Sequence, residues 1–105
     1  MLKSKEIFAE CVKKWGVDSQ VAMCIEEMAE LTQALCKMKR HNYTWTSTDS
    51  DGRWANLAEE VADVELMLDQ VKYMFEIYRT DYRKRKKLAK LQELLKERSK
   101  PIYHG

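Results

Sequence analysis

One stretch of 18 residues decides the fold: Val21 to Met38, which reads VAMCIEEMAELTQALCKM. Its apolar residues recur at steps of 3, 4, 3, 4 and 3, as Val21, Cys24, Met28, Leu31, Leu35 and Met38. This spacing places them on one face of an α-helix, in the pattern typical of a helix that packs in a bundle. We therefore expect a long helix from about Ser19 to Lys39, with Asp18 or Ser19 as its N-cap.

A second stretch, from Leu57 to Tyr78, repeats this design. Its apolar residues recur at steps of 4, 3, 4, 3, 4 and 3, as Leu57, Val61, Val64, Leu68, Val71, Phe75 and Tyr78. It predicts a helix that begins between Arg53 and Asn56 and runs to about Tyr78. Shorter patterns predict helices over about 3–15 and about 80–98. With only 3 Gly and 1 Pro in the chain, we expect an all-α protein, a four-helix bundle.

The 105 residues are enough for one domain, 1–105, with a Thr- and Ser-rich loop over 41–52 and a loose tail over 99–105. No apolar run is long enough to span a membrane, and the N-terminus does not read as a signal peptide. The three cysteines, Cys11, Cys24 and Cys36, are odd in number and fit no zinc pattern. Reduced cysteines predict a reducing compartment, so we expect a cytoplasmic protein.

Charge is divided unequally along the chain. Residues 1–78 hold 9 basic and 14 acidic side chains, whereas residues 79–105 hold 10 basic and 3 acidic ones. An acidic body can hold cations, and a basic C-terminal helix can meet anions.

Two short acidic motifs carry the chemistry: Glu26-Glu27-Met28-Ala29-Glu30 and Glu59-Glu60-Val61-Ala62-Asp63. Each motif sets carboxylates beside an apolar stripe, where charge is costly without a partner. No Lys or Arg follows the same spacing. A hard divalent cation with oxygen ligands, such as Mg²⁺, or Mn²⁺ in its place, would supply that partner.

Spacing alone indicates that the two motifs meet. We call the recurring apolar residues of the two stretches their seam. Glu27 and Glu30 each directly precede a seam residue, and so do Glu60 and Asp63. Both pairs therefore lie on the same flank of their helices, and these flanks face each other when the helices run antiparallel. At a rise of about 1.5 Å per residue, the pairs also fall within about one turn of each other. We expect four carboxylates to converge on one flank.

The two motifs together resemble those of the all-alpha nucleoside triphosphate pyrophosphohydrolases, the superfamily of MazG-type enzymes and dimeric dUTPases. The likeness runs from about Trp15 to Leu95 and is greatest to short MazG-like proteins of phages and bacteria. It implies a Mg²⁺-dependent hydrolase that converts a (d)NTP into the monophosphate and pyrophosphate, as a homodimer or homotetramer. By motif position, the metal ligands are Glu27, Glu30, Glu60 and Asp63, while Glu26 supports catalysis from beside them.

Substrate contacts are predicted less directly. Lys84 and Lys87 match the basic C-terminal segment of the family and would hold phosphates, and Gln20, Trp45 and Trp54 are candidates for contacts with the base. Two other interpretations stay open. The basic last helix could bind nucleic acid, although the acidic body argues against it, or the chain could be an inactive helical interaction protein.

Overall fold

The computed structural model describes residues 2–44 and 52–97 and is helical through most of both ranges. Its helices are α1 (Ser4–Trp15), α2 (Val17–Arg40), α3 (Arg53–Met74) and α4 (Thr80–Lys96). The predicted all-α class and the four predicted helices are confirmed. None of the described helices has a stretch long and apolar enough to cross a membrane.

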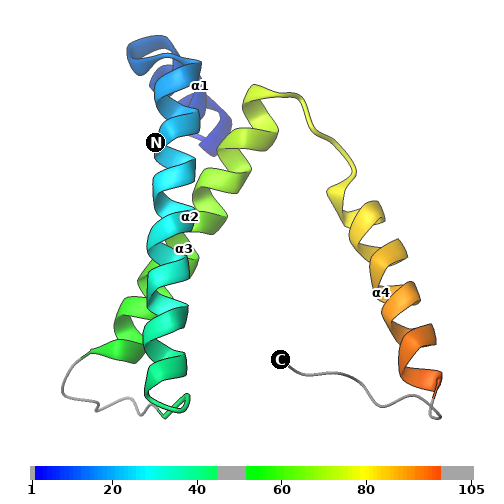
Figure 1. Ribbon diagram of the computed structural model, residues 1–105. Coiled ribbons are helices and arrows are strands. Elements are labelled where there is room, and N and C mark those ends of the chain that lie inside the picture. Colours follow the sequence, from blue (N-terminus) through cyan, green and yellow to red (C-terminus); the bar gives the residue numbers. More distant parts are fainter. Residues whose placement is uncertain (1, 45–51, 98–105) are drawn as a thin grey trace.

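α2 and α3 run antiparallel and lie side by side, and α1 packs against both near the start of α2 (Figure 1). The buried apolar residues of this unit form a narrow line: Phe8 of α1, Cys24, Ala34 and Met38 of α2, and Val64 and Met67 of α3. This three-helix unit positions the candidate site.

The line of contact between α2 and α3 differs from the predicted seam. Four predicted seam residues are 40 to 51% exposed: Met28, Leu35, Val61 and Leu68. Both helices are rotated so that their acidic sides turn toward the contact. Two consequences follow. Glu27 and Glu60 become half-buried, and an apolar surface remains uncovered on the other side.

Gly16 alone joins α1 to α2. Its backbone has φ +87° and ψ 158°, a conformation that is essentially restricted to glycine. The Gly16 N–H donates to the Val12 carbonyl at 2.8 Å, and its own carbonyl accepts from Gln20 at 3.2 Å. Because Gly16 ends one helix and starts the next, α2 begins at Val17, two residues before the predicted Ser19.

α3 ends at Met74, four residues before the predicted Tyr78. Glu76 has a left-handed conformation, φ +52°, and the Ile77 N–H donates to the Lys72 carbonyl at 3.0 Å. This is the hydrogen bond of a Schellman C-cap, in which the left-handed residue is usually Gly. Since Glu76 is not a glycine, the sequence carries no visible stop signal at this point.

α4 stands apart from the rest of the chain (Figure 1). No Cα atom of α4 comes within 8 Å of one in α1, α2 or α3, and the helix has no buried residue. The radius of gyration is 17.9 Å, whereas a compact domain of this length has about 13 Å. Within one chain, therefore, three of the four helices pack together.

Candidate metal centre

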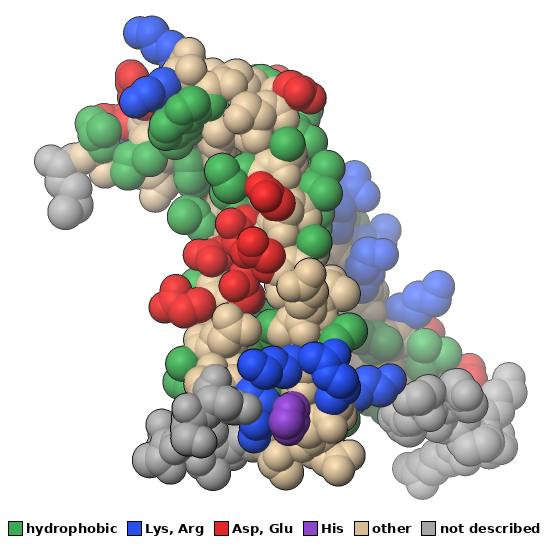
Figure 2. All heavy atoms as spheres, turned by 60° about the vertical axis from the view of Figure 1, so that its left-hand side comes forward, with side chains coloured by type: hydrophobic (Ala, Val, Ile, Leu, Met, Phe, Trp, Pro, Cys, Tyr) green, Lys and Arg blue, Asp and Glu red, His purple; other side chains and the backbone are tan. Residues whose placement is uncertain are grey.

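Three carboxylates from the two acidic motifs converge between α2 and α3. One oxygen of each of Glu27, Glu30 and Glu60 lies within 4.8 Å of the others. Figure 2 shows acidic side chains gathered midway along this face of the molecule. The antiparallel packing of α2 and α3 thus joins residues that are about thirty positions apart in the sequence.

Two oxygens of this cluster are buried without a partner. Oε2 of Glu27 and Oε2 of Glu60 have no hydrogen-bond partner in the described part of the chain. The ion pairs described there, Lys72–Asp69 at 3.7 Å and Arg85–Asp81 at 3.4 Å, lie elsewhere. A buried carboxylate oxygen without a donor or cation is costly, and either a bound cation or a proton on the carboxyl group would reduce this cost.

The electrostatics of the cluster disfavour its fully ionised form. Burial raises the pKa of Glu27, and the charges of Glu30, Asp63 and Glu60 raise it further. The pKa of Glu60 is also raised, first by burial and then by the charges of Glu30 and Asp63. A cation would reverse both effects because it favours the ionised carboxylates.

Asp63 and Glu26 lie at the edge of the cluster. Asp63 is half-buried and close enough for its charge to act on Glu27 and Glu60, but it is not in the group whose oxygens lie within 4.8 Å. Glu26 is exposed beside Glu27. The donor set is therefore three carboxylates in close contact with a fourth near by. All are hard oxygen donors that fit Mg²⁺ or Mn²⁺.

An apolar cavity of about 520 Å³ opens beside the cluster, between α1 and the α2–α3 pair. Glu27 and Asp63 line one side of it, next to the carboxylate cluster. The rest is mostly apolar and aromatic: Phe8, Cys11, Trp15, Met23, Leu66 and Met67. Its size and lining suit a flat ring system, because ligand cavities of this volume are mostly apolar with a few polar groups.

Two glutamines supply polar groups in this cavity. Gln20 and Gln70 both line it and are only 5% and 3% exposed. Gln70 Nε2 donates to Gln20 Oε1 at 2.7 Å. Gln20 was a predicted base contact, and the structure places it in the cavity beside the acidic cluster. Gln70 was missed, although a polar residue between Met67 and Val71 on an otherwise apolar face was a usable signal.

A polar hollow of about 430 Å³ lies on the other side of the cluster. Glu30 and Glu60 line it together with Lys37 and Arg40 from the last turns of α2, and with Asn56 of α3. Basic side chains gather at this end of the α2–α3 pair in Figure 2. The sequence prediction missed Lys37 and Arg40. Their spacing of seven and ten residues after Glu30 places them on the same side of the helix.

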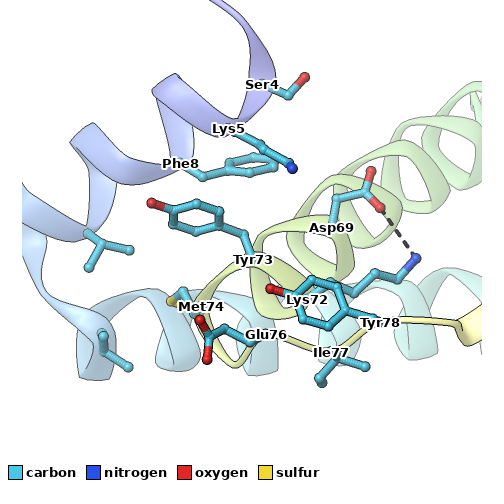
Figure 3. Close-up of a pocket in the computed structure, with 12 residues that line it drawn as sticks. Ser4, Lys5, Phe8, Asp69, Lys72, Tyr73, Met74, Glu76, Ile77 and Tyr78 are labelled. Carbon is cyan, nitrogen blue, oxygen red and sulfur yellow. Dashed lines mark ion pairs between the residues drawn. The ribbon is translucent and has the colours of Figure 1, made fainter.

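A third hollow, of about 620 Å³, lies away from the acidic cluster (Figure 3). It is formed by α1, the end of α3 and the residues after it, with the Phe8 and Tyr73 rings 6.1 Å apart. Its Asp69 is paired with Lys72. We do not place the site here, because this hollow has no converging carboxylates.

The remaining predicted substrate residues are not brought to the cluster by this chain. Trp54 is 47% exposed and lines neither hollow that borders the cluster. Lys84 and Lys87 are on α4, which contacts no other helix. Trp45 lies outside the described residues.

Searches of protein-family models, curated proteins and solved structures give no match to this chain.

Proposed function

We propose that the chain is a Mg²⁺-dependent nucleoside triphosphate pyrophosphohydrolase of the MazG type, which hydrolyses a (d)NTP to the monophosphate and pyrophosphate. One observation carries this proposal: Glu27, Glu30 and Glu60 converge, and two of their buried oxygens have no partner. Carboxylates cannot bind a triphosphate directly, so their convergence is useful for this substrate only with a cation between them. Mn²⁺ would serve as a substitute with the same oxygen ligands.

The acidic residues would have two roles, to bind the cation and to orient the attacking water. Glu27, Glu30, Glu60 and Asp63 would hold the cation. When bound, Mg²⁺ would neutralise phosphate oxygens and lower the pKa of a bound water. Glu26, exposed beside the ligands, would orient that water by accepting a hydrogen bond from it.

The two hollows suggest how the substrate lies. The base and sugar would enter the apolar cavity, where Gln20 and Gln70 offer amide groups and Trp15 an aromatic face. The distal phosphates would point the other way, toward Lys37 and Arg40. The scissile bond then falls at the carboxylate cluster, which borders both hollows. Lys84 and Lys87 could reach phosphates only from a second copy of the chain.

We propose that the protein acts in the cytoplasm as a homodimer or homotetramer and removes unwanted nucleotides from the pool. The three cysteines are free, which agrees with a reducing compartment.

The direct test is to incubate the purified chain with each of the NTPs and dNTPs plus Mg²⁺ and to quantify both products. We expect equimolar pyrophosphate and monophosphate from at least one nucleotide, and none in the presence of a chelator. Glu60→Gln is the matched inactive variant, and Glu65→Gln, an exposed change on the same helix, is the control. Inorganic phosphate without pyrophosphate would show a different bond cleavage, and no product from any nucleotide would refute the proposal.

A further inference from the structure

α2 and α3 share an uncovered apolar surface, which we call the apolar flank. It comprises Ile25, Met28, Leu35, Val61, Leu68 and Phe75, which are 40 to 59% exposed. Met28 precedes Glu30 by two residues, and Val61 precedes Asp63 by two. Two residues turn a helix by about 200° and one residue by about 100°. Met28 and Val61 therefore lie on the sides of their helices away from Glu30 and Asp63, and about a quarter turn from Glu27 and Glu60.

α4 carries a second uncovered apolar surface, the leucine face. It comprises Leu88, Leu91, Leu94 and Leu95, which are 50 to 65% exposed. Their steps of three, three and one place them within about 120° around the helix. An amphipathic helix gains most of its stability from packing its apolar face, and this one packs against nothing in its own chain.

We propose that two copies of this chain exchange their last helices, so that the leucine face of each α4 packs on the apolar flank of the other copy. This inference is independent of the proposed enzymatic activity, because it depends only on surfaces outside the acidic cluster and the hollows beside it.

The charges of the helices favour packing of α4 on the apolar flank over packing of α4 on a second α4. α4 has seven Lys and Arg against two acidic residues, a net charge of +5. α2 and α3 together have nine acidic and five basic residues, a net charge of −4. Four of these nine acidic residues, Glu27, Glu30, Glu60 and Asp63, belong to the acidic cluster and its edge, and the other five balance the five basic residues. The apolar flank can therefore accept the basic α4 without net repulsion, whereas pairing two α4 helices would bring like charges together.

The amount of exposed surface also agrees with a stable partner. The chain exposes 9099 Å², whereas a folded monomer of 12.5 kDa exposes about 6,200 Å². The excess of about 2,900 Å² exceeds the roughly 800 Å² per partner that a standard interface buries. An exchanged helix covers two apolar surfaces, the leucine face of α4 and the apolar flank of the other copy.

The linker between α3 and α4 is consistent with this exchange. Five residues separate the helices, enough for a hairpin that would fold α4 back on its own α3. Instead, Glu76 and Arg79 both have left-handed backbones, φ +52° and φ +63°, and α4 leads away. Nucleic acid is a weaker candidate for the occupant, because it would use the basic side chains of α4 and leave the four leucines exposed to water.

The test combines two variants of the full chain. One replaces leucines of α4, Leu88→Glu with Leu91→Glu. The other replaces residues of the flank, Leu35→Glu with Leu68→Glu. All four positions are exposed within one chain, so each variant should keep its helices, which far-UV circular dichroism checks. Lys86→Ala, on the opposite side of α4 from Leu88, is the matched control. Light scattering after size exclusion gives the mass.

We expect the wild type and the control to run as two chains or a multiple of two, and each double variant to run as one chain. Mixing the two variants should restore a one-to-one dimer, because one intact α4 then meets one intact flank. Flank-to-flank or α4-to-α4 packing cannot restore it, so a mixture that stays monomeric overturns the proposal. A monomeric wild type also overturns it, and duplex binding with steep salt dependence by that monomer would assign α4 to nucleic acid instead.

Discussion

Gln70 Nε2 donates a hydrogen bond of 2.7 Å to Gln20 Oε1, and this bond joins α3 to α2 at the buried wall of the apolar cavity. The same pair serves the fold and the proposed site. It satisfies two amides that would otherwise be buried without partners, and it fixes the direction in which they present donors and acceptors to a ligand.

Replacing Gln70 by Leu should destabilise the protein by about 1–3 kcal/mol, because the amide oxygen of Gln20 loses its donor in a buried place. The double variant Gln20→Leu with Gln70→Leu should recover most of this loss, since two apolar groups leave no polar atom unpaired. Urea denaturation of the two single variants and the double variant measures the coupling. The double variant should still have a higher KM for its preferred nucleotide. Additive losses of stability would show that the bond contributes nothing.

The raised pKa of Glu60 predicts an unusual pH dependence for the metal-free protein. The folded state binds more protons than the unfolded state between 4.5, the ordinary pKa, and the raised value. Stability should therefore fall as pH rises through that window. Glu60→Gln mimics the protonated carboxyl, so in a chelator it should be more stable than the wild type at neutral pH. The difference should vanish below pH 4.5.

Urea denaturation at several pH values, with chelator present, checks this prediction. Glu65→Gln, on the exposed side of the same helix, should follow the wild type throughout. In assays with Mg²⁺, Glu60→Gln should lose more than about 100-fold in kcat/KM, since changing even the outer partners of a metal costs roughly 10- to 100-fold. A variant that is less stable than the wild type at neutral pH without metal would mean that some group in the protein already compensates the Glu60 charge.

Mg²⁺ should stabilise the wild type through the same carboxylates. A ligand that binds only the folded state adds about 2.7 kcal/mol at a concentration of 100 times Kd, which appears as a higher Tm in a thermal scan. Glu30→Gln should remove most of this rise, and Glu10→Gln, an exposed change on α1, should leave it intact. Equal Tm shifts in both variants would indicate that Mg²⁺ binds elsewhere.

Gly16→Ala should cost about 1–3 kcal/mol, because φ +87° with ψ 158° is available almost only to glycine. No atom lies within 4 Å of the added Cβ, so the cost comes from the backbone and not from a clash. The change should loosen α1 and raise the KM for nucleotide, since α1 forms one wall of the apolar cavity. Gly52→Asn, at φ +70° where Asn is tolerated, is the control and should be nearly neutral.

The helices could be predicted from the sequence because apolar residues recur at helical steps over long runs. The face on which α2 and α3 meet could not. Met28 and Leu35 are at least as apolar as Cys24 and Ala34, and nothing local decides which of them becomes buried. That choice is made by the contacts between α2 and α3 over their whole length, which the spacing within one helix does not encode.

The candidate site could be predicted in part for the same reason. Paired acidic motifs at matching levels on antiparallel helices bring Glu27, Glu30 and Glu60 together. The apolar cavity depends on where α1 packs, and the polar hollow depends on how α2 and α3 are rotated against each other. From the sequence alone, little distinguishes Gln70, Lys37 and Arg40 from other polar residues, because their places in the hollows depend on how the helices pack.

Lys37 and Arg40 provide the sharpest test of how the substrate lies. Both line the polar hollow with Glu30 and Glu60, on the side of the cluster away from the apolar cavity. Charge-assisted hydrogen bonds to phosphate are roughly twice as strong as neutral ones, so Lys37→Ala with Arg40→Ala should raise the KM for the triphosphate at least 10-fold. Lys39→Ala, exposed and outside the hollow, is the control. Inhibition by the monophosphate product should be unchanged, because that nucleotide has no distal phosphates. If the double variant bound monophosphate and triphosphate with equally reduced affinity, the two side chains would act on the α-phosphate or on the fold. The proposed direction of the substrate would then be wrong.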